Sequence, residues 1–190
     1  MIATTPKSTI SLEEFLALPD DGVDRELIRG EIRENGMTYR NRSHARTEAR
    51  VGHLLESWLE KQNQPRGAVL AGESGFRLQS DPATIVGIDV AYISAETVSR
   101  LGDESKMIDE PPVLAVEILS PSNDVESIHE KIRLYLESGV KLVWIVDPEF
   151  RTVVVHRPDA QPTMFNAEQE ITAEPFLPGF RDQIVKFFEI

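Results

Sequence analysis

Two short apolar runs enclose a segment with helical spacing, and this pattern constrains the fold more than any other part of the chain. The runs, residues 113–119 and 141–146, are bounded by turn residues, which is typical of strands buried on both faces. The segment between them predicts a helix that begins at Ser122 or Asn123 and ends before Gly139, with an apolar stripe formed by Ile128, Ile132, Tyr135 and Leu136. A strand–helix–strand unit of this kind implies a parallel pair of strands with a right-handed crossover.

The rest of the chain also alternates between helical and strand patterns. Helices are predicted at 11–18, 43–62 and 95–101, and strands at 25–28, 31–34, 68–71, 75–78, 87–93 and 151–156. The Phe-rich residues 175–190 are expected to pack as a terminal segment. We therefore expect an α/β fold whose mixed sheet contains a central strand–helix–strand crossover and is flanked by helices, in a single domain of residues 1–190.

Charge and composition exclude several classes of protein. The net charge of −12, from 32 acidic and 20 basic residues, argues against a protein that coats nucleic acid, because its long-range field would repel phosphate. A nuclease stays compatible, since a carboxylate metal site is itself acidic. The absence of cysteine excludes disulfides, thiolate zinc sites and a cysteine nucleophile. No apolar run approaches the roughly 20 residues of a membrane span, and residues 1–10 lack a secretory signal pattern, so we expect a cytoplasmic protein.

A carboxylate interrupts the first of the two buried runs. Leaving Glu117 unpaired in such a strand would cost on the order of several kcal/mol. Asp89 interrupts a second apolar run, residues 84–93. Two strand-borne carboxylates suggest a shared hard cation, and with the backbone carbonyl of Ile118 they form an all-oxygen set that favours Mg²⁺ or Mn²⁺ over zinc. Two simpler interpretations stay open: Glu117 as a strand-end residue paired with an arginine, and Asp89 as an acceptor for backbone donors in a turn.

A lysine follows on the predicted crossover helix. A helix packed on the sheet can present Lys131 toward the end of the strand that precedes it. At a metal held by Asp89 and Glu117, bound water is more acidic and phosphate charge is neutralised, while Lys131 would orient that water or stabilise charge on phosphate oxygens. These are the parts of a metal-dependent phosphodiesterase. The alternative is that Lys131 is a solvated side chain or an ion-pair partner.

These residues resemble the PD-(D/E)XK nuclease superfamily, whose pattern is an Asp followed by Glu-x-Lys on the next strand. Asp89 matches the Asp, with Ile88 in place of the preceding Pro, and Glu117 matches the Glu. Leu119 stands where the Lys is expected. One branch of the superfamily carries that Lys on the following helix, and Lys131 matches this arrangement.

The sequence resembles the Uma family of restriction-endonuclease-like proteins within that superfamily. The resemblance runs from about Ser11 to the terminal segment. It rests on five sequence motifs that occur in the same order: Arg25-Glu26-Leu27-Ile28-Arg29-Gly30-Glu31, His44 at the start of a long helix, residues 116–122, Lys131-x-x-x-Tyr135 and Trp144-Ile145-Val146-Asp147-Pro148. It implies a restriction-endonuclease-like fold and an endodeoxyribonuclease that uses Mg²⁺ or Mn²⁺. It also implies that Glu26 joins the site, with Glu31 as the second choice, and that His44 contacts phosphate or solvent near the metal.

A basic stripe follows one face of the predicted long helix. Arg42, Arg46 and Arg50 recur every four residues, either as a patch that tracks nucleic-acid phosphates or as a solvated face paired with acids. The expected partner is nucleic acid, DNA first, and a homodimer would suit double-strand cleavage. Two other functions stay open: a catalytically degenerate binding or interaction module on a nuclease fold, favoured by Leu119 and the net charge of −12, and a hydrolase of small phosphoesters.

Overall fold

The computed structural model describes residues 9–19, 21–35, 41–102, 107–121 and 123–189. The strands are β1 (Asp24–Ile28), β2 (Glu31–Asn35), β3 (Ala68–Ser80), β4 (Ala83–Ile93), β5 (Leu114–Ile118), β6 (Leu142–Asp147), β7 (Thr152–Arg157), β8 (Ala160–Asn166), β9 (Glu170–Thr172) and β10 (Arg181–Gln183). The helices are α1 (Leu12–Leu16), α2 (Arg42–Leu59), α3 (Ala95–Arg100), α4 (Val125–Ser138) and the 3-10 helix η1 (Ile184–Phe188).

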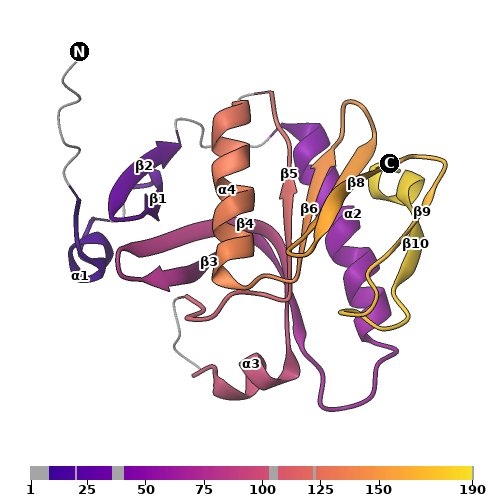
Figure 1. The fold of residues 1–190 in the computed structure, drawn as a ribbon, viewed down its shortest axis with the longest axis horizontal. Coiled ribbons are helices and arrows are strands. Elements are labelled where there is room, and N and C mark those ends of the chain that lie inside the picture. The colour runs from indigo at the N-terminus through magenta and orange to yellow at the C-terminus, as the bar shows by residue number, and fades with distance from the viewer. Residues whose placement is uncertain (1–8, 20, 36–40, 103–106, 122, 190) are drawn as a thin grey trace.

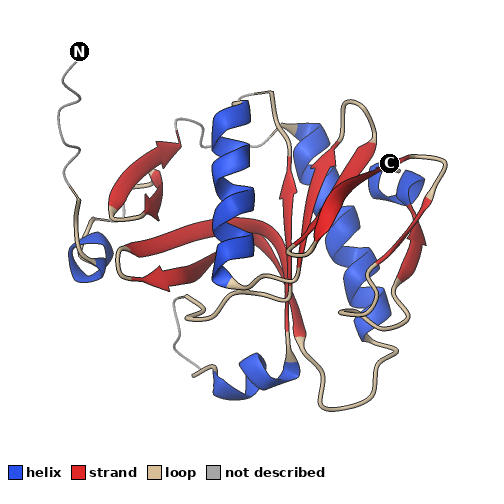
Figure 2. Cartoon of the chain, viewed as in Figure 1, coloured by secondary structure: helices blue, strands red, loops and turns tan. Residues whose placement is uncertain are grey.

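A mixed sheet organises these elements. Within the described residues it has eight strands in the order β2-β1-β4-β5-β6-β7-β8, with β3 paired to β4 off this path, while β9 and β10 form a separate pair (Figures 1 and 2). Strands β5 and β6 are parallel, in register from Leu114 opposite Leu142 to Ile118 opposite Val146, and α4 makes the crossover between them. The predicted α/β fold and its central strand–helix–strand unit are therefore confirmed.

The crossover helix starts and stops where its side chains and backbone require. Asp124 caps α4 by accepting a hydrogen bond from the Ser127 N–H at 2.8 Å, slightly later than the predicted start at Ser122 or Asn123, and Ser122 lies outside the described residues. Gly139 ends the helix in the left-handed conformation, with φ 105°, which glycine adopts without steric cost.

The helices cover the two faces of the sheet (Figure 1). One face packs against α4 through an apolar cluster that includes Ala115 and Tyr135. The other face packs against α2 and the C-terminal elements, with Trp144, Phe180 and Phe187 fully buried or nearly so. The burial of these two Phe side chains confirms the prediction of a packed Phe-rich terminal segment. Burying one such side chain stabilises the fold by about 1.5–3 kcal/mol.

Three boundaries differ from the sequence-based expectations. The helix α2 is capped by Asn41, which accepts a hydrogen bond from the His44 N–H at 2.8 Å, two residues before the predicted start at Ser43. Strand β3 is continuous from Ala68 to Ser80 rather than two separate strands. The gap between the two predicted strands is a bulge at Gly72 and Glu73, opposite Asp89, where both residues have left-handed φ values, 86° and 57°. The strands β8, β9 and β10 were not predicted, since β8 is almost wholly exposed and lacks apolar alternation.

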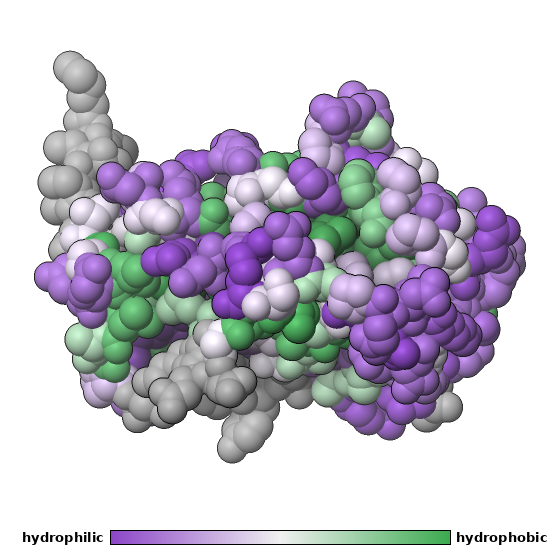
Figure 3. Space-filling view, turned by 90° about the horizontal axis from the view of Figure 1, so that it is seen from below, coloured by the Kyte–Doolittle hydropathy of each residue, from purple (hydrophilic) through white to green (hydrophobic). Residues whose placement is uncertain are grey.

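None of the helices in the described part of the chain is long and apolar enough to cross a membrane. On the face shown in Figure 3, apolar areas are separated by polar residues. The large apolar side chains with high exposure are spread over several elements: Leu16, Val23, Ile32, Leu101, Val125, Phe150 and Met164.

Strand β4 has a fork along one of its edges. Strand β3 pairs along one edge for most of the length of β4. On the other edge, β1 pairs near the start of β4, at Leu27 opposite Ile85, and β5 pairs near its end, from Val90 opposite Val116 onward. Within the described chain, residues 86–89 of β4 therefore lie between the diverging strands β1 and β5, where side chains rather than a strand meet their backbone.

Candidate active site

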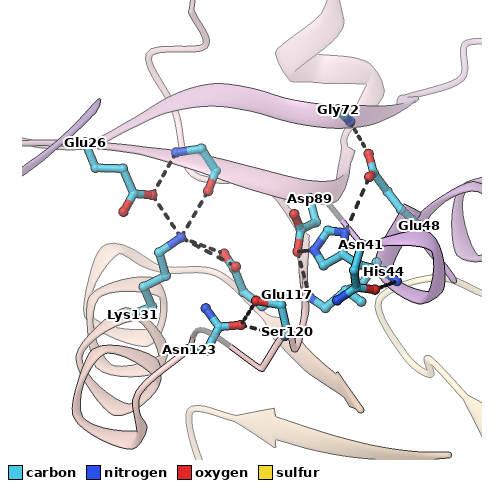
Figure 4. Close-up of polar contacts among 12 residues, drawn as sticks. Glu26, Asn41, His44, Glu48, Gly72, Asp89, Glu117, Ser120, Asn123 and Lys131 are labelled. Carbon is cyan, nitrogen blue, oxygen red and sulfur yellow. Dashed lines mark hydrogen bonds and ion pairs between the residues drawn. The ribbon is translucent and has the colours of Figure 1, made fainter. Parts of the chain in front are cut away.

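A cleft of about 620 Å³ lies at this fork. One wall is the β1–β2 hairpin and the other is the N-terminal half of α4, while strands β4 and β5 form its floor. Its charged lining residues are Glu26, Arg33, Glu34, His44, Glu73, Asp89, Glu117, Asp124, Glu130 and Lys131. Four residues that the sequence singles out from four different segments, Glu26, Asp89, Glu117 and Lys131, thus line one cleft (Figure 4).

Lys131 reaches from α4 to the carboxylate on β5. Its Nζ lies 3.5 Å from both carboxylate oxygens of Glu117 and 2.8 Å from Oε1 of Glu26, so Figure 4 shows it between the two. It also lies 3.4 Å from the carbonyl oxygen of Gly87, in the fork of β4. Burial lowers the pKa of Lys131, but the carboxylates of Glu117 and Glu26 outweigh this effect and raise it, so the ammonium stays charged.

Glu117 points to the α4 face of the sheet, where Tyr135 donates a hydrogen bond to its Oε1. Tyr135 is fully buried, so its hydroxyl has a fixed partner rather than solvent. Burial raises the pKa of Glu117 to about 7, and the charges of Asp89 and Glu26 add to this rise, against the opposing effects of Lys131 and Tyr135. The partners of Glu117 are thus a lysine and a tyrosine, not the arginine of the simpler interpretation.

Asp89 is held by two donors from different elements. Its Oδ2 accepts the Ile118 N–H of β5 at 2.7 Å and lies 3.3 Å from Nε2 of His44. Asp89 is 5% exposed and His44 is 2% exposed, so both are removed from bulk water. The backbone donor comes from the strand that carries Glu117 rather than from a turn, and this bond ties the two carboxylates to one place.

His44 continues this chain of contacts away from the cleft floor. Its Nδ1 lies 3.9 Å from the carboxylate of Glu48, which in turn accepts the Gly72 N–H at 2.6 Å on the bulge of β3 (Figure 4). The prediction that His44 contacts phosphate or solvent stays a prediction. Its position supports a role in orienting Asp89, because contacts of this kind fix the direction of a ligating carboxylate.

Of the two acids proposed from the hairpin, Glu26 is the one that lines the cleft. Glu26 is 7% exposed, and its Oε1 accepts the Gly87 N–H at 3.1 Å as well as the ammonium of Lys131. Glu31 is not a lining residue and pairs with Arg33 at 3.3 Å. Glu26 therefore connects the hairpin, the fork of β4 and the crossover helix.

The basic stripe of α2 lies elsewhere. The Nε atoms of Arg46 and Arg50 donate to the backbone carbonyls of Glu189 and Lys186, each at 3.0 Å, so both side chains fasten the C-terminal segment to α2. Arg42 is exposed. None of the three lines the cleft, and their predicted contact with nucleic acid stays a prediction without support from these bonds.

The donor set of the cleft fits a hard divalent cation. The carboxylates of Glu26, Asp89 and Glu117 are met by one ammonium, that of Lys131, which leaves negative charge to compensate. The N–H and C=O of a strand residue point to the same edge, so the bond from the Ile118 N–H to Asp89 directs the Ile118 carbonyl toward β4. These are oxygen donors, which Mg²⁺ and Mn²⁺ prefer.

Side chains alone would not complete such a site. Within the residues that the structure describes, no three His, Asp or Glu side chains form a group that could hold a metal ion. A cation between Asp89 and Glu117 would therefore also need the Ile118 carbonyl and oxygens of solvent or substrate. Mg²⁺ commonly binds in this way, through one or two carboxylates and several waters.

Two cleft contacts were not predicted. Tyr135 is expected from the sequence as part of the apolar stripe of the crossover helix, but its hydroxyl donates a hydrogen bond to Glu117. Arg33 was not singled out, although the two-residue turn at Arg29 and Gly30, with φ values of 51° and 81°, fixes the hairpin register that places it opposite Glu26. That turn was visible in the sequence, so the signal for Arg33 was available.

The chain is similar to proteins of one family over almost its whole length. A family model, Uma2, described as "Putative restriction endonuclease", matches residues 12–185. The crystal structure of "a putative nuclease belonging to DUF820 from Anabaena variabilis ATCC 29413" has a TM-score of 0.81 to this chain at 22% sequence identity, and the match covers 94% of this chain and 97% of that chain. At this identity the likeness shows a shared fold. No curated protein matches.

Proposed function

The chain belongs to the Uma2 restriction-endonuclease family, and from this premise we propose that it hydrolyses phosphodiester bonds of nucleic acid, DNA first, with Mg²⁺ or Mn²⁺. In this proposal Asp89, Glu117 and the Ile118 carbonyl hold the cation, and Lys131 acts on the reacting groups. The observation that carries the proposal is the contact of Lys131 with both oxygens of Glu117, because it supplies from α4 the lysine that the strand lacks at Leu119.

A cation in the cleft would supply Lewis-acid chemistry to the phosphate and make a bound water more acidic. The chain's own residues then have separate tasks. Asp89 and Glu117 would hold the cation and so fix where a phosphate can bind on the floor of the cleft. Lys131 donates its N–H groups to the attacking water and to the oxygens on which negative charge develops. The attack of the water forms one P–O bond and breaks the P–O bond to the leaving nucleotide, and overall one proton of the water passes to the leaving oxygen.

The residues around this set hold it in place. Glu26 and the Gly87 carbonyl hold the ammonium of Lys131, which rises from a helix and would otherwise sample several rotamers. Tyr135 holds one oxygen of Glu117, and His44 holds one oxygen of Asp89. We infer that Glu26 acts through Lys131, because its carboxylate contacts the Lys131 ammonium and the Gly87 backbone N–H.

A cleavage assay tests the proposal. The purified chain is incubated with Mn²⁺, with Mg²⁺ or with chelator, on plasmid, single-stranded DNA, RNA and a nitrophenyl phosphodiester. The proposal expects cleavage of a nucleic acid only with the cation, and loss of cleavage in Glu117→Ala and Glu117→Gln with the fold retained by circular dichroism. Metal-dependent cleavage by Glu117→Ala at the wild-type rate would end it, and cleavage of the small diester alone would identify a small-phosphoester hydrolase.

A catalytically degenerate binding or interaction module on the same fold is the second candidate. Leu119 at the position of the expected lysine and the lack of a three-residue metal group among the described side chains favour it. Calorimetric titration with Mn²⁺ separates the two functions. The nuclease binds Mn²⁺ and loses binding in Asp89→Asn and Glu117→Gln, whereas a degenerate module shows no binding in any of the three proteins.

A further inference from the structure

We propose that Arg33 holds a backbone phosphate of the nucleic acid in the cleft, and that Glu130 occupies the same guanidinium while the cleft is free. This inference rests on the proposed function, since it names the group that receives the substrate beside the reacting centre. It is carried by the position of Arg33, by its unused hydrogen-bond donors and by the charges of the cleft lining.

The hairpin register places Arg33 next to the reacting groups. Arg33 on β2 lies directly opposite Glu26 on β1. Directly opposite residues of an antiparallel pair point to the same face of the sheet, with Cβ atoms about 4.5–5.5 Å apart. Glu26 contacts Lys131 at 2.8 Å, so Arg33 stands one side chain away from the ammonium that we assign to the reaction. Both residues line the cleft.

The guanidinium of Arg33 is only weakly engaged. One terminal nitrogen lies 3.3 Å from Glu31 and 3.8 Å from Glu130, and the second distance is long for an ion pair. The Nε of Arg33 is buried and has no hydrogen-bond partner among the described residues. The side chain is nevertheless 41% exposed, so a ligand can reach it. An arginine offers five N–H donors in a fork that matches two phosphate oxygens.

The charges of the lining leave few groups for an anionic substrate. Among the described lining residues, Lys131 is the one lysine and Arg33 is the one arginine. Lys131 is already shared by Glu26, Glu117 and a backbone carbonyl. The other charged lining residues are mostly acidic, so a phosphate beside the scissile one would be repelled from most of the cleft and attracted to Arg33.

The contact between Arg33 and Glu130 spans the cleft from β2 to α4. A phosphate that binds Arg33 takes the place of the Glu130 carboxylate, and Glu130 then lies near a second negative charge. Removing the carboxylate should therefore strengthen substrate binding, while removing the guanidinium should weaken it. Long-range charge alone would also give changes of opposite sign, so the distinguishing result is that the gain from removing the Glu130 carboxylate depends on Arg33.

A matched ion pair joins the same hairpin to α4 away from the cleft lining. Arg29, in the hairpin turn, lies 3.1 Å from Glu137 on α4, and neither residue lines the cleft. The variants Arg29→Gln and Glu137→Gln therefore carry the same charge changes between the hairpin and α4. They control for long-range charge and for the attachment of the hairpin.

The experiment measures the Kd for a fluorescent 20-base-pair DNA duplex at several salt concentrations, with Ca²⁺ as the probe cation. Arg33→Gln should weaken binding by about tenfold, the lower end for a hydrogen bond to a charged group, and should lower the slope of log K against log salt by about 0.9. Glu130→Gln should tighten binding, and this gain should vanish in the double variant with Arg33→Gln. Arg29→Gln and Glu137→Gln should show neither the lower slope nor the coupling.

Two results would overturn the role of Arg33 and leave the proposed function standing. One is wild-type affinity and salt slope in Arg33→Gln, and the other is an equal gain from Glu130→Gln with and without Arg33. Mn²⁺ binding by calorimetry should be the same in wild type and Arg33→Gln, which separates loss of the phosphate contact from loss of the cation. If the wild-type chain binds no duplex, single strand or RNA, both this inference and the proposed function fail.

Discussion

The ammonium of Lys131 on α4 lies 2.8 Å from a carboxylate oxygen of Glu26 on β1, although α4 and β1 are not adjacent in the sequence. This contact explains how a helix-borne lysine can serve a site built on strands. Leu119, which directly follows β5, is partly buried and packs against the α4-side apolar cluster. Position 119 is thus used for packing, and Glu26 holds the ammonium of the helix-borne lysine beside Glu117.

Replacing Lys131 tests its part in the reaction. Lys131→Met keeps the apolar stem and removes the ammonium, so we expect cleavage to fall by about 10²–10³-fold, the cost of one donor to a developing charge. Mn²⁺ should still bind, because Asp89 and Glu117 are intact. Single-turnover cleavage and Mn²⁺ calorimetry measure the two effects, with the exposed Lys141→Met as control. Unchanged cleavage would show that Lys131 is only an ion-pair partner.

Glu26→Gln distinguishes a positioning residue from a metal ligand. The amide oxygen can still accept the Gly87 N–H, but the charge that holds Lys131 is gone. We expect slower cleavage at saturating substrate with Mn²⁺ affinity close to that of wild type. The matched control is Glu31→Gln, on the same hairpin but not in the cleft lining. Loss of Mn²⁺ affinity as large as that in Asp89→Asn would instead make Glu26 a ligand.

Tyr135→Phe removes the hydroxyl that bonds Glu117 and leaves the buried ring. We expect Mn²⁺ affinity to fall by about 10–100-fold, as is typical when the partner of a ligating group is lost. The free energy of unfolding should fall by only about 0.5–1.5 kcal/mol, the net worth of one hydrogen bond. Calorimetry and urea unfolding give the two numbers. Wild-type Mn²⁺ affinity in Tyr135→Phe would contradict the assigned contact.

Arg50 should contribute to stability and not to cleavage. Its guanidinium donates to the Lys186 carbonyl at 3.0 Å and lies 3.3 Å from the Glu189 carboxylate. Arg50→Gln should lower the free energy of unfolding by about 1 kcal/mol, because the bonds are partly exposed. DNA affinity should match that of the exposed-site control Arg42→Gln. A loss of DNA affinity specific to Arg50→Gln would restore the phosphate-tracking role of the stripe.

The parallel pair and the two strand-borne carboxylates were predictable because burial leaves a clear signal. A charged residue in an otherwise apolar run, as at Glu117 and Asp89, is costly enough to need a reason. The position of Lys131 toward Glu117 also follows from packing a crossover helix on the strand that precedes it. The apolar runs and the helical periodicity are local patterns, so a single stretch of sequence is enough to predict these features.

The rest of the site depends on contacts between distant segments. The fork of β4 arises because β1 and β5 pair with different lengths of the same edge, and no local pattern specifies this. The spacing of Arg46 and Arg50 correctly placed both on one helix face. It could not show that the backbone of residues 186–189 covers that face. Strand β8 is exposed and was missed because nothing in it alternates.

The central claim is that Asp89 and Glu117 share a divalent cation within reach of Lys131. Diffraction from crystals soaked in Mn²⁺, collected with its anomalous signal, tests this most directly. We predict an anomalous peak between the carboxylates of Asp89 and Glu117, with the Ile118 carbonyl as a further ligand, and no peak there in Glu117→Gln. A peak bound by other residues, or no peak at saturating Mn²⁺ in the wild-type protein, would contradict the claim.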